Sequence, residues 1–266
     1  MAPDPARPYP NGVEAVFEIA RRLRAPNGCP WDQEQTHLSL RPYLLEETYE
    51  LLEAIDHADD AKIEEELGDV LLQVAMHSAI AQEQGRFDAA QVSESSAAKM
   101  VARHPHVFGD AQVRSAEEVL GLWEREKERA AAAAGREGTV LDRVPPALPA
   151  LAWVYNMQKR AARIGFDPSP EPESTGGLDA LARTLEASGD TVERERLLGE
   201  LLFQIADLAR RLKVNPEDAL RARGSQFKER FGRMDEELKR SGLELHDMDG
   251  EAQQEAWRRA QLGGEI

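Results

Sequence analysis

The stretch that decides the fold is residues 66–76, which read ELGDVLLQVAM. Apolar side chains occupy almost every position of its helical wheel, which is typical of a helix that is covered on most sides. Asp69 lies inside this run, and Glu66 precedes it by three residues, so both carboxylates share one helix face. A buried carboxylate is too costly to keep unless it is paired, protonated or bound to a metal ion. We therefore expect Asp69 to be buried and to have a partner.

A second carboxylate pair with the same spacing, Glu47 and Glu50, lies on the preceding amphipathic segment. Taken alone, this pair fits a solvated helix face. If the two helices pack together, however, four carboxylates meet, and four like charges need a counter-ion. Oxygen ligands without Cys or His favour Mg²⁺, with Mn²⁺ as a possible substitute, and Mg²⁺ in such sites usually acts on substrate phosphates. The candidate metal ligands are Glu47, Glu50, Glu66 and Asp69.

Helical periodicity recurs along the whole chain, and alternating β-branched runs are essentially absent, so the sequence predicts an all-α protein. Glycines and prolines between residues 135 and 149 indicate a linker between two sets of helices. The predicted helices span residues 13–24, 40–57, 61–84, 88–103 and 116–133, and then 150–164, 178–187, 193–212, 216–230 and 251–260.

Composition limits the class of protein. The 266 residues are 31% charged and 41% hydrophobic, which is typical of a soluble globular protein. No stretch approaches the ~20 consecutive apolar residues of a membrane span, and the first twelve residues lack the apolar core of a signal peptide. A formal charge of −16 argues against binding to long nucleic acid, and a single cysteine fits a reducing compartment. We expect a cytoplasmic protein without membrane or nucleic-acid partners, whose phosphate ligands are small.

The two halves of the chain repeat each other. Residues 67–75, LGDVLLQVA, correspond to residues 198–206, LGELLFQIA. The second copy lacks the acidic set, because Leu197 stands where Glu66 does and residues 178–186 supply only Asp179 and Glu186. We predict a catalytic domain over 13–134, a linker over 135–149 and a degenerate structural or regulatory repeat over 150–262. Further matches are Lys99 with Gln226, Arg103 with Arg230, and Trp123 with Trp257.

Several motifs follow one another along the chain: Cys29-Pro30-Trp31-Asp32, Gln35-Thr36-His37, Pro42 to Glu47 with Tyr49 and Glu50, Glu66 to Asp69, and Arg103 to Phe108. Together they resemble the MazG family of nucleoside triphosphate pyrophosphohydrolases, and the resemblance covers nearly the whole chain.

The resemblance implies tandem helical domains and hydrolysis of NTPs and dNTPs to the monophosphate and pyrophosphate with Mg²⁺. It also implies a homodimer whose helices form a shared four-helix bundle. Within that family the metal ligands fall on Glu47, Glu50, Glu66 and Asp69. MazG proteins can carry chemistry in the second half, whereas here that half lacks the ligands, so we expect one active centre per chain.

The residues suggest a mechanism in which water attacks the α-phosphorus of the bound triphosphate. Glu46 and Glu50 are the candidate catalytic carboxylates: Glu46 lies one turn from Glu50 and could orient or deprotonate the water. The alternative for Glu46 is a solvated helix carboxylate. Lys62, Lys99 and Arg103 are the candidate phosphate contacts. The alternatives are an i,i+4 ion pair with Glu66 for Lys62 and plain surface charge for the other two.

Trp31 and Trp123 are candidates for stacking on the nucleobase, with packing anchors as the alternative. His37 fits a helix-start or turn role, and His77 fits a satisfied core or interface histidine.

Three rival interpretations remain open at this stage. One is a narrow dUTP or phosphoribosyl-ATP pyrophosphohydrolase with the same acidic helices. Another is a di-iron bundle, which needs a Glu and a His three apart that neither acidic pair supplies. The third is a non-catalytic partner-binding helical protein, against which the complete first-half ligand set argues.

Overall fold

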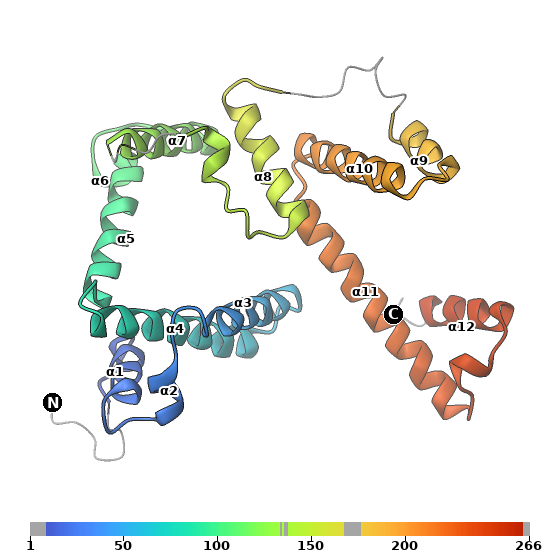
Figure 1. Ribbon diagram of the computed structural model, residues 1–266, viewed down its shortest axis with the longest axis horizontal. Coiled ribbons are helices and arrows are strands. Elements are labelled where there is room, and N and C mark those ends of the chain that lie inside the picture. Colours follow the sequence, from blue (N-terminus) through green and yellow to red (C-terminus); the bar gives the residue numbers. More distant parts are fainter. Residues whose placement is uncertain (1–8, 134, 136–137, 168–176, 263–266) are drawn as a thin grey trace. The chain divides into compact units, whose positions relative to one another are not determined.

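The computed structural model describes residues 9–133, 135, 138–167 and 177–262 (Figure 1). Every regular element within these residues is helical, which confirms the predicted all-α fold. The chain divides into two compact units, residues 1–136 and residues 137–266, and each unit is described by itself.

The first unit is built around one long helix, α4, against which α1 and α3 pack. Its core is formed by Ala20 of α1, Leu40 before α3, and Ala75, Met76 and Ile80 of α4. The decisive stretch of the sequence therefore lies at the centre of the unit. The elements are α1 (Glu14–Arg24), α2 (Pro30–Glu34), α3 (Arg41–Asp56), α4 (Asp60–Glu83), α5 (Ala89–Arg103), α6 (Pro105–Phe108) and α7 (Ala116–Ala133).

Local sequence signals set the two ends of α4. Asp59 caps the first turn, because its carboxylate accepts a hydrogen bond from the backbone N–H of Lys62 at 3.1 Å. Gly85 follows the last turn with a φ of +65°, a conformation that favours glycine. The helix that carries Glu66 and Asp69 therefore has a capped start and a glycine after its last turn.

A proline ends α5. His104 precedes Pro105 and leaves the helical region, with φ −120° and ψ 54°, because the proline ring disfavours helical geometry in the residue before it. The chain turns there into the short α6 and then into α7, so α5 and α7 pack on each other.

The second unit repeats the order of the first. In it, α8 and α9 pack against α10, as α1 and α3 pack against α4. A separate core joins α11 to α12 through Met234, Leu238, Ala256 and Ala260. The elements are the 3₁₀ helix η1 (Val140–Arg143), α8 (Ala150–Arg163), α9 (Gly177–Ala187), α10 (Thr191–Arg211), α11 (Pro216–Arg240), the 3₁₀ helix η2 (Leu245–Asp247) and α12 (Gly250–Leu262).

One predicted helix ends at the wrong place. The helical period predicts a helix over residues 216–230, but α11 continues to Arg240. The counterpart helix α5 ends at a proline, whereas residues 217–240 contain none, and the glycines Gly224 and Gly232 each cost a helix only ~1 kcal/mol. The short helices α2, α6, η1 and η2 also had no prediction, because three to five residues are too few to show a period.

No helix among the described residues is both long enough and apolar enough to cross a membrane.

Candidate metal centre

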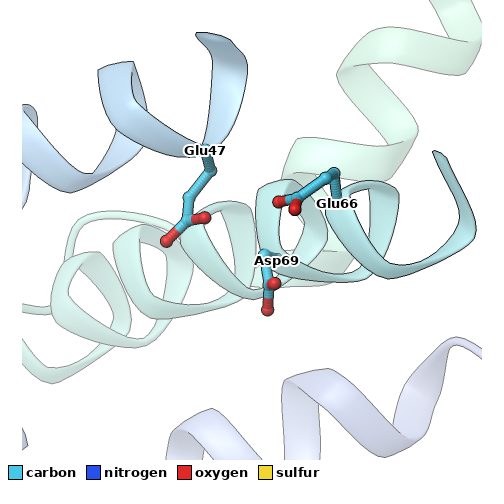
Figure 2. A group of neighbouring side chains, drawn as sticks. All are labelled: Glu47, Glu66 and Asp69. Atoms are coloured by element: carbon cyan, nitrogen blue, oxygen red, sulfur yellow. The ribbon is translucent and has the colours of Figure 1, made fainter. Parts of the chain in front are cut away.

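Three carboxylates from two helices converge in the first unit. Glu47 on α3 and Glu66 and Asp69 on α4 each offer an oxygen, and these oxygens all lie within 4.8 Å of one another (Figure 2). Figure 2 shows Glu47 reaching from α3 toward the two side chains on α4. Within the residues that the structure describes, this is the one grouping of three or more Asp, Glu, His or Cys side chains with such geometry.

The burial of the centre corrects one expectation. Glu66, only 1% exposed, is the buried carboxylate, and Asp69 is half-buried. The prediction for Asp69 assumed that apolar residues cover α4 all round. In fact Leu67 and Val74 are 54% and 38% exposed, so one side of α4 is uncovered.

The fourth predicted ligand lies at the rim. Glu50 is exposed, one turn after Glu47, and lies close enough to Glu66 for the charge of Glu66 to act on it. Glu46 is also exposed, and its charge acts on both Glu47 and Glu50. The structure therefore groups Glu47, Glu66 and Asp69 at the centre and leaves Glu50 and Glu46 beside them.

Electrostatics in the centre favour a cation. Burial, and then the charges of Asp69 and Glu50, raise the pKa of Glu47 above its ordinary value. The neighbouring Glu66 raises the pKa of Glu50. The Oε2 atom of Glu66 is buried and has no hydrogen-bond partner in the described part of the chain. A buried acceptor among like charges, with oxygen ligands only, fits a hard divalent cation.

Lys62 forms an ion pair with Glu66, which was expected from the sequence as the alternative to phosphate contact. Its ammonium group lies 2.8 Å from Glu66 Oε1 and 3.0 Å from Glu65 Oε2, and the bond to Glu66 raises the pKa of Lys62. One oxygen of the buried carboxylate is thus paired, and the other faces the neighbouring acids.

Lys99 and Arg103, the basic pair on α5, lie far from the carboxylates of α3 and α4 in the same chain. Lys99 is exposed and Arg103 is half-buried near the end of α5, which leads away from the α3–α4 pair (Figure 1). From Asp69 to the end of α4 at Glu83 the helix rises ~21 Å, and α5 begins only beyond that point.

The two tryptophans have different surroundings. Trp31 is 50% exposed on α2 and meets the Tyr43 ring edge-on, with ring centroids 5.8 Å apart. Trp123 is half-buried on α7, with its ring 5.1 Å from that of His104 and edge-on to it. The indole Nε1 of Trp123 is buried and has no hydrogen-bond partner in the described residues.

A polar cluster that the sequence did not predict lies farther along α4. The rings of His37 and His77 are nearly parallel, with centroids 5.0 Å apart and Nδ1 atoms 2.7 Å apart, and Arg86 contacts Nε2 of His37. We expected His77 to be a satisfied core or interface histidine. Its Nδ1 atom contacts His37, but its Nε2 atom is buried without a partner within the described ranges, so the packing of this unit alone does not satisfy it. The interface role stays a prediction. Neither Arg86 nor Gln73 was singled out. The one feature of the sequence that could have indicated this cluster is the spacing of Gln73 and His77, which puts them on the same helix face as Glu66.

The second unit holds no counterpart of the centre among its described residues. Leu197 occupies the place of Glu66 and is 3% exposed. Glu200, in the place of Asp69, accepts a hydrogen bond from Gln204 at 2.9 Å. The degenerate acidic set is thus replaced by apolar packing and a local hydrogen bond.

The raised pKa of Glu47 gives a pH-dependent prediction. Between its ordinary pKa of 4.5 and the raised value, the folded chain binds more protons than the unfolded chain. We therefore expect the metal-free protein to lose stability as the pH rises through this window. Affinity for Mg²⁺ should increase over the same window, since the cation displaces the proton. Thermal unfolding and calorimetric Mg²⁺ titration between about pH 4.5 and pH 7 measure both effects. A Mg²⁺ affinity independent of pH would contradict the prediction.

Comparison with known proteins adds an independent observation. The MazG nucleotide pyrophosphohydrolase domain matches residues 35–108, which span α3, α4 and α5. A protein of Thermotoga maritima named nucleoside triphosphate pyrophosphohydrolase/pyrophosphatase MazG is 40% identical over 252 residues, covering 95% of this chain and 96% of its own. The nucleoside triphosphate pyrophosphohydrolase of Escherichia coli is 38% identical, covering 93% and 96%. That of Mycobacterium tuberculosis is 38% identical over 68% of this chain and 54% of its own.

Proposed function

The chain belongs to the MazG family of nucleotide pyrophosphohydrolases, and we propose that it hydrolyses nucleoside triphosphates, both NTPs and dNTPs, to the monophosphate and pyrophosphate. Water adds its oxygen to the α-phosphorus, and the bond from that phosphorus to the oxygen bridging it to the β-phosphorus breaks. The bridging oxygen leaves with pyrophosphate. The observation that carries this proposal is the convergence of Glu47, Glu66 and Asp69 within 4.8 Å.

The three carboxylates, together with Glu50 at the rim, would hold Mg²⁺, with Mn²⁺ as a possible substitute. A bound divalent cation supplies positive charge that polarises the phosphoryl group and offsets the charge of the leaving group. Lys62 holds one oxygen of Glu66 and thereby fixes the buried ligand. Glu46, which is exposed on α3 one turn before Glu50, would orient or deprotonate the attacking water.

The test is pyrophosphate release from the four NTPs, the four dNTPs and dUTP, with Mg²⁺ and with excess chelator. We expect release from most of the panel, and loss of release with chelator. Release from dUTP alone would show the narrow enzyme instead. No release from any nucleotide would refute the proposed function.

We also propose that two copies of the chain form a homodimer in which each site is shared. The exposed Leu67 and Val74 lie beside the acidic stripe of α4, and Leu45 and Ile55 of α3 are 56% and 51% exposed. Such an apolar face is suited to a second copy. Since α5 leads away from the acids of its own chain, Lys99 and Arg103 can contact phosphates held at the partner's acids.

Complementation between inactive variants tests the shared site. We expect Asp69→Asn and the double variant Lys99→Ala with Arg103→Ala each to have little activity. After the two are mixed, unfolded and refolded together, half of the dimers carry both chains, and one of their two sites is intact. Activity should therefore return to about a quarter of wild type. Two copies of the same variant, treated identically, are the control. Absence of recovery, with dimers present by light scattering, would contradict the shared site.

A further inference from the structure

The acidic stripe of α4 continues beyond the metal centre as a polar stripe. Glu66, Gln73 and His77 are spaced seven and four residues apart and therefore share one helix face. Each carries a buried polar atom that has no hydrogen-bond partner in the described part of the chain: Glu66 Oε2, Gln73 Oε1 and His77 Nε2. Gln73 is only 8% exposed. Buried polar groups normally have partners, so three on one stripe indicate one elongated ligand.

The hydrogen bonds around His77 determine which kind of atom its Nε2 presents. Arginine can only donate, so His37 Nε2, which Arg86 contacts, must accept. A neutral His37 then carries its proton on Nδ1 and donates it to Nδ1 of His77, 2.7 Å away. His77 in turn carries its own proton on Nε2. Burial lowers the pKa of both rings, which keeps them neutral near pH 7. The buried, unpartnered atom of His77 is therefore an N–H donor.

The stripe thus offers a carbonyl acceptor on Gln73 and an N–H donor on His77, one helical turn apart. These groups are not metal ligands: His77 lies ~12 Å along the helix from Asp69, far beyond a coordination shell, and Gln73 lies ~6 Å along it. A substrate with its phosphates at the acids extends its nucleoside away from them. The edge of a nucleobase presents a donor and an acceptor side by side.

We propose that Gln73 and His77 bind the edge of the nucleobase and set the base preference of the enzyme, with His37 and Arg86 as positioning residues that fix the proton on Nε2 of His77. This inference rests on the proposed triphosphate hydrolysis at the neighbouring acids. It assigns to α4 both ends of the substrate, the phosphates at Glu66 and Asp69 and the base at His77.

The test compares Gln73→Met and His77→Phe with wild type on the eight nucleotides. Each substitution keeps the approximate volume of the side chain and removes the hydrogen-bonding group. We expect KM to rise about 3- to 10-fold for the preferred bases, with kcat nearly unchanged, so that the ranking of bases flattens. The inhibition constant of inorganic tripolyphosphate, which carries no base, should stay within about twofold. The matched control is Gln204→Met, because Gln204 occupies the same place in the second unit and is 7% exposed; its base ranking should equal that of wild type.

Other outcomes would overturn the inference. If wild type is active and both variants keep its base ranking, the pair does not bind the base. A change in the ratio of NTP to dNTP hydrolysis without a change in base ranking would place the pair at the ribose. An equal loss for all nucleotides and for tripolyphosphate would show a structural role. If wild type releases no pyrophosphate at all, the proposed function has failed instead.

A variant outside the core keeps the inference testable if Gln73→Met or His77→Phe fails to fold. Arg86 is exposed, and Arg86→Met removes the donor that fixes the protons of the histidine pair. We expect the thermal midpoint to be nearly unchanged and the base ranking to flatten, by less than in His77→Phe. An unchanged ranking in Arg86→Met would remove Arg86 and His37 from the proposal. If the base ranking is unchanged in Arg86→Met and His77→Phe does not fold, base binding by His77 is overturned as well.

Discussion

Replacing Asp69 with Asn is expected to lower kcat/KM for pyrophosphate release by about 10²- to 10³-fold, the size of effect seen when one group that stabilises a transition state is removed. The amide is nearly the same size as the carboxylate, but it carries no charge and is a weaker ligand for Mg²⁺. Asp69 is half-buried, so the substitution should leave the fold intact. Steady-state kinetics with a coupled pyrophosphate assay measure the change, and circular dichroism checks the fold.

The repeat supplies a matched control for Asp69→Asn. Glu200 stands in the same place of the second unit, and its carboxylate accepts a hydrogen bond that an amide oxygen can also accept. Glu200→Gln should therefore retain wild-type turnover. Equal activity of Asp69→Asn and wild type, or an equal loss in Glu200→Gln, would contradict a single metal centre in the first unit.

Glu66→Leu is expected to stabilise the metal-free protein and to abolish its stabilisation by Mg²⁺. Glu66 is buried against the like charges of Glu47 and Asp69, and Leu197 fills the same place in the second unit. Apolar packing in place of a buried charge is often neutral or stabilising by about 1–4 kcal/mol, provided that no buried partner is left unpaired. The partner of Glu66 is Lys62, whose side chain is 49% exposed and keeps its ion pair with Glu65. Wild type should gain ~2.7 kcal/mol from Mg²⁺ at a hundredfold excess over Kd, and the variant none.

Thermal unfolding with chelator and with Mg²⁺ measures both effects of Glu66→Leu. Glu64→Gln is the control, because Glu64 is exposed on the same helix; it should respond to Mg²⁺ as wild type does. If metal-free Glu66→Leu is less stable than metal-free wild type, the inferred repulsion of Glu66 by Glu47 and Asp69 is contradicted. A thermal midpoint that still rises with Mg²⁺ would contradict the ligand assignment.

Sequence patterns predicted those parts of the fold that depend on local chemistry. The period of residues 61–84 gives α4 to within a residue or two, and the repeat gives the order of the second unit. The spacing of the acids also predicted the convergence of α3 and α4, since residues three apart on each helix share a face. The extension of α11 beyond Arg230 was not predicted, although residues 217–240 contain no proline that would end the helix.

The burial of individual side chains depends on tertiary packing and could not be predicted in the same way. The wheel of α4 favoured Asp69 as the buried acid, but α1 and α3 cover the side that holds Glu66 and leave Leu67 exposed. The contact between His37 and His77 joins residues 40 positions apart, and the contact with Arg86 joins residues 49 apart. No local period encodes such pairs. Their hydrogen-bonding roles follow only once all three side chains are placed.

We propose that the first unit cleaves nucleoside triphosphates by attack of water on the α-phosphorus. Hydrolysis of a nucleoside triphosphate in ¹⁸O-labelled water with Mg²⁺, followed by mass spectrometry of both products, tests this directly. We expect one labelled oxygen in the nucleoside monophosphate and none in pyrophosphate, with the whole reaction lost in Asp69→Asn. Label in pyrophosphate, or release of orthophosphate and a nucleoside diphosphate, would contradict it.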